Sequence, residues 1–348
     1  MSKSIGWAAT SATSPLSRYV FERREPRIND VVIDILFCGV CHSDIHTARN
    51  EWPGTVYPIV PGHEIIGRVT RRGDEVTKFQ IGDLVGVGCM VDSCLSCDEC
   101  LAGLEQYCVS GHTWTYGSED DLEEQTQGGY SDRIVVREEF VVRIPTSLDP
   151  ASAAPLLCAG ITTYSALRHW KAGPGSRVGI AGFGGLGDMG VKLAKALGAE
   201  VVVLTRSVNK MTAALKVGAD AVVDVADDAA MHKTERTLDL IVSTIPRSHD
   251  VEPYLKLLKV DGTYVILGAI EPMKEPYDSV ELVSRRASIA GSDIGGLRET
   301  QELLDFCAEN KILSNVQVVS IDEVNDVYDR IAAGEPAHRY VIDMSSLN

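Results

Sequence analysis

The chain has 348 residues, of which 45% are hydrophobic and 24% charged, so it can bury the core of one large domain or of two smaller ones. Its formal net charge of −16 leaves no basic field to attract phosphate, which argues against nucleic acid and anionic membrane surfaces as partners. The start, MSKSIGWAAT, lacks the apolar stretch of a signal peptide, and no apolar run approaches the roughly 18 residues of a membrane span. We therefore expect a cytoplasmic enzyme.

The first part of the chain predicts a β-rich domain. Runs rich in β-branched residues and separated by turn residues recur at 30–40, 64–76, 82–88 and 133–145. We therefore read residues 1–150 as short strands joined by turns.

A cluster of potential metal ligands follows the predicted strand at 30–40. The segment 38–46 (CGVCHSDIH) holds two cysteines, two histidines, a hydroxyl and an acid, and PGHE follows at 61–64. Another cysteine, Cys158, comes where a second domain begins. Two cysteines and one histidine can bind zinc and leave its fourth position open for a substrate. The spacing alone does not choose Cys41 over Cys38, or His63 over His42.

Four more cysteines lie within the fifteen residues CLSCDECLAGLEQYC, at Cys94, Cys97, Cys100 and Cys108. In a reducing cytosol, clustered cysteines are more often metal ligands than disulfides. Two-residue gaps bring successive sulfurs to one point, and four thiolates form a closed tetrahedral zinc shell. The alternatives are an iron–sulfur cluster and a chance run of cysteines. A closed shell has no position for a substrate, so we expect this zinc to stabilise a lobe.

From about residue 151 the pattern changes to alternating strands and helices. Helices and strands are predicted at 153–170, 177–207, 219–225, 238–245, 251–260 and 262–270, followed by a helix at 298–310 and a strand at 338–344. This alternation predicts an α/β domain with a doubly wound parallel sheet.

A glycine-rich turn within this second domain predicts a dinucleotide site. The motif GFGGLG fits G-x-G-x-x-G, follows the predicted strand RVGIA and precedes a predicted helix at 188–197. Its glycines would let the backbone approach a pyrophosphate at the helix N-terminus. The alternative is a glycine-rich turn without a ligand. The residues that we expect to bind the cofactor here are Gly182, Gly184, Gly185, Leu186 and Gly187.

The end of the next predicted strand indicates which dinucleotide is bound. An NAD site usually has an acid there, about 20 residues after the motif, on the ribose 2′-hydroxyl. This chain instead has Thr205, Arg206, Ser207 and Lys210, which offer two cations and two hydroxyls for a 2′-phosphate. We therefore expect NADPH or NADP⁺, the alternative being that Arg206 and Lys210 are solvated residues of a helix start.

These motifs together resemble the zinc-dependent medium-chain alcohol dehydrogenases. The resemblance is closest to the cinnamyl alcohol dehydrogenase type, with its bacterial NADPH-dependent aldehyde reductases, and it extends to GTVYPIVPGHEIIGRV, QGGYSDRIVV and PLLCAGITTYSALRHW. It implies a β-rich, GroES-like catalytic domain made of 1–151 and 291–348 beside a Rossmann dinucleotide-binding domain at 152–290. The sequence leaves the oligomeric state open, although the family is often dimeric, so a homodimer is one expectation.

The resemblance also implies a role for individual residues. The catalytic zinc ligands would be Cys41, His63 and Cys158, with Glu64 beside them, and the structural zinc ligands would be Cys94, Cys97, Cys100 and Cys108. Ser43 would begin a proton relay, His46 would end it, and Asp44 would support the site. Ser207 and Lys210 would read the cofactor phosphate, and Arg339 would lie near the pyrophosphate. Asp188 departs from the family, where we expect a histidine, and adds a negative charge near the pyrophosphate.

The predicted activity is that of a zinc-dependent, NADPH-preferring alcohol dehydrogenase that acts mainly as an aldehyde reductase. Zinc would polarise the aldehyde oxygen, the nicotinamide would donate hydride, and Ser43 would supply a proton that returns through a ribose hydroxyl and His46. Two rivals share the fold: a reductase with a narrow biosynthetic iminium or alkene substrate, and a non-catalytic NADP-binding protein. The full set of catalytic ligands argues against the second, and the sequence does not identify the substrate.

Overall fold

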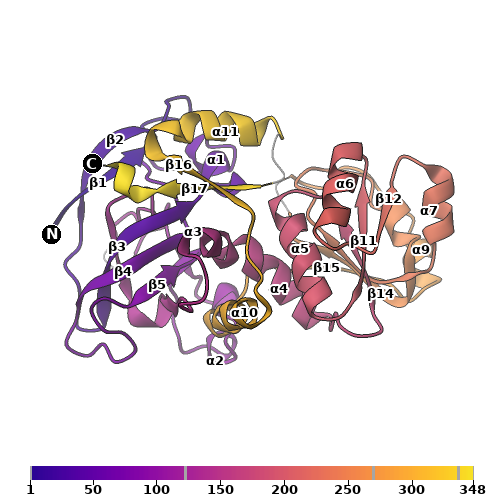
Figure 1. Cartoon of the computed structure of the whole chain (residues 1–348), viewed down its shortest axis with the longest axis horizontal. Coiled ribbons are helices and arrows are strands. Elements are labelled where there is room, and N and C mark those ends of the chain that lie inside the picture. The colour runs from indigo at the N-terminus through magenta and orange to yellow at the C-terminus, as the bar shows by residue number, and fades with distance from the viewer. Residues whose placement is uncertain (1, 121–123, 269–270, 335–337, 348) are drawn as a thin grey trace. The chain divides into compact units, whose positions relative to one another are not determined.

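The computed structural model describes residues 2–120, 124–268, 271–334 and 338–347. The chain forms two compact units, shown in Figure 1: unit 1 is Met1–Cys158 with Gly295–Asn348, and unit 2 is Ala159–Ile294. The sequence placed the divisions after residues 151 and 290, whereas the units divide after 158 and 294. Among the described residues, no helix is both long and apolar enough to cross a membrane.

Unit 1 is built on a mixed seven-stranded sheet whose central strand, β3, is buried along most of its length. In order, its strands are β16 (Val316–Ser320), β17 (Arg339–Asp343), β3 (Asp30–Gly39), β4 (Ile65–Arg72), β5 (Leu84–Val87) and β9 (Val142–Arg143), with β8 (Arg133–Arg137) also paired to β3. Val341 of β17 lies antiparallel and opposite Gly39 of β3. The C-terminal segment is therefore an integral part of the first domain's sheet.

Two small antiparallel pairs and several short helices complete unit 1. The pairs are β1 (Ser2–Ala8) with β2 (Ser17–Arg23) and β6 (Met90–Asp92) with β7 (Thr113–Trp114). The helices are α1 (His42–Ala48), α2 (Asp98–Leu101), α3 (Pro150–Ala153), α10 (Leu297–Asn310) and α11 (Val324–Ala332), with single 3₁₀ turns η1 (Glu105–Tyr107), η2 (Glu138–Phe140), η3 (Ala154–Leu157), η4 (Ile321–Glu323) and η5 (Met344–Leu347).

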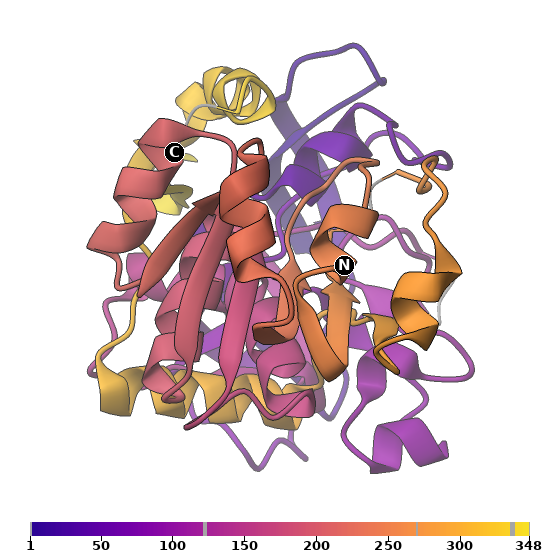
Figure 2. The same ribbon diagram turned by 90° about the vertical axis from the view of Figure 1, so that its right-hand side faces the viewer.

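Unit 2 contains a six-stranded parallel sheet, with helices on both faces (Figure 2). Its strand order is β12 (Ala221–Asp224), β11 (Glu200–Thr205), β10 (Arg177–Ala181), β13 (Leu238–Ser243), β14 (Leu258–Ile266) and β15 (Ser288–Gly291). Numbered from β10, this is the 3-2-1-4-5-6 order of a doubly wound dinucleotide-binding sheet. The predicted α/β class is therefore confirmed, and the strand order reverses between β10 and β13, where ligands of such sheets bind.

The helices of unit 2 connect these parallel strands. They are α4 (Ala159–His169), α5 (Gly185–Ala196), α6 (Val208–Lys216), α7 (Asp228–Thr234), α8 (Glu252–Leu255) and α9 (Ser279–Val283). Strand residues such as Leu204, Ile241 and Tyr264 are fully buried and form part of the core. Continuous burial of this kind is expected where helices cover both faces of a parallel sheet.

Two predicted helices differ from the structure. The helix expected at 153–170 is interrupted at Cys158, whose φ and ψ of −132° and −72° are not helical. The helical stretch expected at 251–260 ends at Leu255, and strand β14 begins at Leu258, because Leu258 pairs with Leu238 of β13. Residues 269–270 of the strand expected at 262–270 lie outside the described residues. In both cases tertiary contacts outweigh local helix propensity.

Candidate metal centres and active site

Four buried side chains from three separate segments converge in unit 1. Cys41 precedes α1, His63 and Glu64 precede β4, and Cys158 follows η3. Each offers one potential ligand atom, and these atoms all lie within 4.8 Å of one another. Two sulfurs, an imidazole nitrogen and a carboxylate form a donor set that suits zinc and can change its coordination during a reaction.

The structure thus distinguishes the residues that spacing alone left equivalent. Cys41 and His63 belong to the converging set, while Cys38 lies on β3 with its sulfur facing the glycines at positions 62 and 129. His42 stacks on His46, with ring centroids 6.0 Å apart, and is not among the converging ligands.

Local backbone features bring these ligands together. Cys41 is the N-cap of α1, so its extended backbone turns the chain out of β3 and into the helix. Gly62 has φ of +106°, a conformation that glycine adopts without strain, directly before His63. The interruption at Cys158 separates η3 from α4 at the ligand itself.

Burial and close charges shift the ionisation of the converging groups. Hydrogen bonds from Cys158 and His63 lower the pKa of Cys41 well below its ordinary value, despite burial. Burial raises the pKa of Glu64 to about 7, although the guanidinium of Arg339 opposes this shift. The lowered pKa of Cys41 favours its thiolate, which is the form of cysteine that binds metal.

The carboxylate of Asp44 connects the ligand segments. Its Oδ1 accepts hydrogen bonds from Gly62 N at 3.0 Å and from His63 Nδ1 at 3.1 Å. Its Oδ2 accepts from Cys41 N at 2.8 Å and from the hydroxyl of Tyr130 at 3.1 Å. Because Nδ1 of His63 donates to Asp44, Nε2 is the nitrogen available as a ligand.

Ser43 and His46 lie three residues apart on α1, so their side chains share one face of the helix. The sulfur of Cys41 lies 3.7 Å from the Ser43 hydroxyl oxygen. Nδ1 of His46 bonds to the carboxylate of Glu51, and Nε2 of His46 is buried without a partner among the described residues. His46 also packs on Trp52, with centroids 5.2 Å apart.

Arg339 lies on β17 and is buried in unit 1, where it forms an ion pair with Glu64. The sequence placed it near the cofactor pyrophosphate; the contact observed is with Glu64, and the pyrophosphate contact stays a prediction. This pair neutralises charge that the interior would otherwise hold uncompensated.

The four clustered cysteines form a second site in unit 1. The sulfurs of Cys94, Cys97, Cys100 and Cys108 lie within 4.8 Å of one another, and those of Cys94 and Cys100 are 3.9 Å apart. Zinc–sulfur bonds of about 2.3 Å in a tetrahedron require sulfur separations of about 3.8 Å. The set therefore fits one zinc ion in a closed shell. Hydrogen bonds from Ser96 and Cys97 lower the pKa of Cys94 to about 5.

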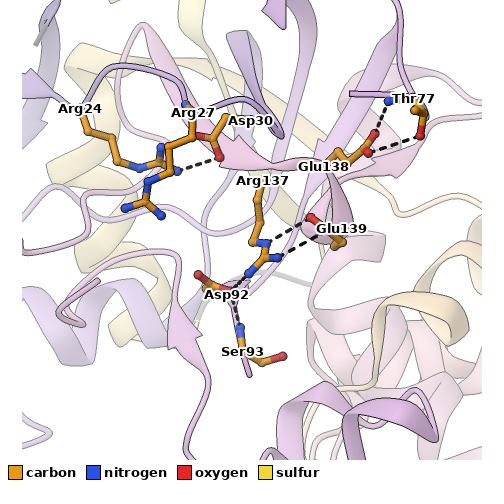
Figure 3. A network of polar contacts seen from close by, with 9 residues as sticks. All are labelled: Arg24, Arg27, Asp30, Thr77, Asp92, Ser93, Arg137, Glu138 and Glu139. Atoms are coloured by element: carbon orange, nitrogen blue, oxygen red, sulfur yellow. Dashed lines mark hydrogen bonds and ion pairs between the residues drawn. The ribbon is translucent and has the colours of Figure 1, made fainter. Parts of the chain in front are cut away.

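Polar contacts anchor the four-cysteine lobe (residues 94–108) to the rest of unit 1. Figure 3 shows that Arg137 on β8 joins Asp92, at 2.7 Å, to Glu139, at 3.1 Å. Asp92 ends β6 and lies two residues before Cys94. Further along the loop, the carboxylate of Glu105 accepts a hydrogen bond from Leu297 N, at the start of α10.

The glycine-rich turn of unit 2 lies at the carboxyl end of β10. Gly182 has φ of +87°, and helix α5 begins at Gly185 with Gly184 as its N-cap. A Cβ at Gly187 would lie 2.6 Å from the carbonyl oxygen of Gly182, whereas a Cβ at Gly184 would meet nothing within 4 Å. The backbone is therefore tightly packed at Gly187, while the space beside Gly184 is open. An open space at this end of the helix is what a bound pyrophosphate requires.

Asp188 lies in the first turn of α5 and pairs with Lys192 at 2.7 Å. Burial raises the pKa of Asp188, and Lys192 offsets part of this shift. The extra negative charge noted in the sequence is thus partly neutralised by its neighbour.

The residues expected to select the cofactor lie where β11 meets α6. Thr205 ends β11 and is buried, Arg206 is exposed, and Ser207 is the N-cap of α6 without a side-chain cap bond. Within the described part of the chain, neither Arg206 nor Lys210 is held in an ion pair. Both cations are therefore available to an anionic ligand.

Comparisons with known proteins agree with this architecture. The alcohol dehydrogenase GroES-like domain model matches residues 27–146, and the zinc-binding dehydrogenase model matches residues 185–309. NADP-dependent alcohol dehydrogenase C of Mycobacterium tuberculosis is 51% identical over 348 residues, 100% of each chain. Aldehyde reductase YahK of Escherichia coli is 51% identical over 99% of each chain. A cinnamyl alcohol dehydrogenase structure from Sorghum bicolor has a TM-score of 0.95 and 42% identity over 99% of this chain and 98% of that one.

The chain belongs to the zinc-binding alcohol dehydrogenases, a family of oxidoreductases with a GroES-like and a Rossmann-like domain. The resemblance recognised from the motifs is confirmed, as is the predicted pairing of the two domain types.

The sequence did not reveal four residues that surround these sites: Tyr130, Glu51, Glu105 and Arg137. Tyr130 and Glu105 lie far along the chain from Asp44 and Leu297, and Arg137 lies 45 residues from Asp92, whereas Glu51 lies five residues after its partner His46. Of these residues, only Tyr130 lies in a stretch that the sequence analysis singled out, because QGGYSDRIVV contributed to the family resemblance.

Proposed function

We propose that the protein is an NADPH-dependent aldehyde reductase whose catalytic zinc is held by Cys41, His63 and Cys158, with Glu64 beside it. The observation that carries this proposal is the convergence of these four buried side chains within 4.8 Å. The named activities of the relatives from Mycobacterium tuberculosis and Escherichia coli support the reaction class. The substrate class is accordingly a small aldehyde or the corresponding primary alcohol.

When bound, zinc supplies Lewis-acid polarisation of a carbonyl oxygen, and the nicotinamide supplies the hydride. The chain's own residues handle the proton. Ser43 is adjacent to the ligand Cys41 and donates a proton to the oxygen of the reduced substrate. His46 follows one turn later on the same helix face and resupplies it. Glu51 holds Nδ1 of His46, so Nε2 is the nitrogen that exchanges protons.

The cofactor is proposed to bind unit 2 at the carboxyl end of β10. Its pyrophosphate would face the open side of the turn at Gly184. The 2′-phosphate would meet Arg206, Ser207 and Lys210, since a guanidinium binds phosphate in a forked geometry and Lys acts as a point charge. These contacts would contribute about 3–4 kcal/mol, which is a preference for NADPH over NADH of roughly a few hundredfold.

The test is a panel of aldehydes assayed for kcat/KM with NADPH and with NADH. We expect turnover with both cofactors and a strong preference for NADPH. Arg206→Ala should raise the KM for NADPH and leave that for NADH nearly unchanged. Lys216→Ala, which removes a cation from the far end of α6, is the matched control. No turnover of any aldehyde would overturn the proposed activity, and equal use of both cofactors would overturn the proposed selectivity alone.

We further propose that the protein forms a homodimer through unit 2. Strand β15 is at the edge of the parallel sheet, with a partner strand on one side only among the described residues. Val260 on β14 and Val280 and Val283 on α9 are exposed. An open edge beside apolar side chains favours pairing with a second copy.

Light scattering should then give twice the 37.6 kDa of one chain. A Val280→Glu/Val283→Glu double variant should shift the protein toward the monomer, whereas Val20→Glu, at an exposed position on β2, should not. A wild-type monomer at micromolar concentration would contradict this part of the proposal. The expected cytoplasmic location stays a prediction.

A further inference from the structure

A short glycine-containing segment, 127–131 (QGGYS), packs directly on the loop that carries His63. Three backbone hydrogen bonds join the segment to the loop and fix the position of the loop's backbone. The bonds run from Gly128 N to Val60 O at 2.7 Å, from Gly129 N to Gly62 O at 2.8 Å and from Tyr130 N to Pro61 O at 2.9 Å.

The two backbones are too close for side chains between them. A Cβ at Gly128 would lie 2.4 Å from the carbonyl oxygen of Pro61, and a Cβ at Gly62 would lie 2.7 Å from the Tyr130 ring. Glycine at both positions lets the segment approach the loop, and the ring of Tyr130 fills the space beside Gly62. The position of the His63 loop is therefore set by this contact.

The side chain of Tyr130 extends the contact to the support of the metal ligands. Tyr130 is fully buried, and its hydroxyl donates to Oδ2 of Asp44 at 3.1 Å. With Cys41 N on the same oxygen and Gly62 N and His63 Nδ1 on the other, Tyr130 completes four hydrogen bonds to Asp44. The buried Tyr116, whose ring lies 5.6 Å from that of His63, contacts the same carboxylate. A carboxylate has about four acceptor sites, so all of them are used.

We propose that Tyr130 is a positioning residue of the catalytic metal centre, acting through Asp44 on His63; this rests on the proposed zinc site at Cys41, His63 and Cys158. The hydroxyl fixes the rotation of the buried carboxylate, which in turn fixes the ring and the tautomer of His63. Without the hydroxyl, Oδ2 loses one of its donors. The carboxylate can then rotate away from His63 Nδ1, and the metal loses an oriented ligand.

The N-terminal hairpin holds the segment from behind. Arg23, at the end of β2, donates from Nη1 to Gln127 O at 2.7 Å and from Nη2 to Gly128 O and Ser131 Oγ, both at 2.9 Å. A guanidinium that binds two successive carbonyls leaves the segment little freedom to move. The chain of contacts thus runs from β2 through the segment to Asp44 and His63.

The experiment compares zinc release to a chromophoric chelator from wild-type protein and from Tyr130→Phe. The Cys158→Ser protein, which lacks one catalytic ligand, identifies the phase that belongs to the catalytic site. We expect Tyr130→Phe to accelerate that phase by about tenfold, the lower end of the effect of removing an outer contact of a metal ligand. The phase from the four-cysteine site should stay unchanged.

Tyr340→Phe is the matched control. Tyr340 lies on β17 and is also buried, its ring lies 5.0 Å from that of His338, and among the described residues its hydroxyl bonds neither Tyr130 nor Asp44. An unchanged release rate in Tyr130→Phe, or an equal acceleration in Tyr340→Phe, would overturn the positioning role. Absence of any Cys158-dependent phase in the wild type would instead overturn the proposed zinc site.

Discussion

At the residue scale, two neighbours on helix α1 have different tasks. Asp44 is fully buried and holds the ligand segments by hydrogen bonds, whereas Ser43 is partly exposed and lies next to the ligand Cys41. Substituting Asp44 would disturb the ligands themselves. Substituting Ser43 removes only a hydroxyl, and it therefore isolates the proton transfer.

Ser43→Ala should lower kcat for aldehyde reduction by roughly 10²–10⁴-fold, the usual contribution of a positioned acid–base group. His46→Ala should cost less, since water can replace the outer member of the relay. Thr47→Val, which also removes a hydroxyl from α1, should leave kcat nearly unchanged. Steady-state kinetics with zinc-saturated protein measure all three, and full activity of Ser43→Ala would remove Ser43 from the mechanism.

A second prediction concerns Asp188 at the start of α5. Asp188→Asn should tighten NADP⁺ binding roughly two- to fivefold at low ionic strength, because a charge near a helix terminus contributes about 0.3–1 kcal/mol. The effect should shrink in high salt. Asp220→Asn, which disrupts a comparable pair with Lys195, is the control. Calorimetric titration gives the dissociation constants, and weaker binding by Asp188→Asn would contradict the prediction.

The pH dependence of stability should follow from the same residue. Burial raises the pKa of Asp188 above its ordinary value of 3.8. As the pH rises, Asp188 in the unfolded chain loses its proton at a lower pH than Asp188 in the folded protein does. The free energy of unfolding therefore falls as the pH rises above about 4. Relative to the wild type, Asp188→Asn should be more stable near neutral pH than near pH 4. Chemical unfolding of both proteins across this range measures the difference.

At the element scale, helix α10 depends on a distant loop for its first turn. Its N-cap is Gly296, which has no side chain to bond the free N–H groups, and Glu105 from the four-cysteine lobe accepts from Leu297 N at 3.0 Å. Arg298 donates back to the carbonyl oxygen of Ala102 in the same lobe. The metal lobe and α10 therefore stabilise each other.

Glu105→Ala should lower the free energy of unfolding by about 1 kcal/mol, as the loss of a helix cap does. Amide hydrogen exchange should rise in the first turn of α10 and little elsewhere. Glu302→Ala removes an exposed carboxylate from the same helix without uncapping it and serves as the control. Unchanged exchange at residues 297–300 in Glu105→Ala would show that the cap is not needed.

At the scale of the whole molecule, unit 1 contains two sets of potential metal ligands, which differ in whether they leave a coordination position open. The set at Cys41, His63 and Cys158 is buried and lies beside the carboxylate of Glu64. The four-cysteine set is closed and lies in a lobe anchored by Arg137 and by α10. We expect one zinc ion in each, the first required for activity and the second for stability.

Cys158→Ser should abolish turnover and leave a folded protein with one zinc per chain. Cys97→Ser should also retain one zinc but melt roughly 5–10 °C lower, since binding of a structural zinc contributes directly to folding. Elemental analysis and thermal unfolding of the two purified proteins measure both effects. An active wild-type protein with one zinc or none would contradict the assignment.

Much of the fold could be read from local patterns. The strand, glycine-rich turn and helix at 177–207 were predictable because the turn conformation and the hydrophobic periodicity are encoded within the segment itself. The interruption at Cys158 was not, because its neighbours favour a continuous helix, and only the packing of the ligand set places a break there. Local preference is a weak force beside tertiary contacts.

The sequence by itself determined the family, the two-domain organisation and the four-cysteine loop, since each rests on spacing within one segment or on several motifs in a fixed order. The tertiary structure decided which of the cysteines and histidines before residue 64 face one another, and that Tyr130 and Arg339 join them. The physical reason is that a buried site is made by strands and loops far apart in the chain. Their relative position depends on the register of the whole sheet, which no short stretch of residues contains.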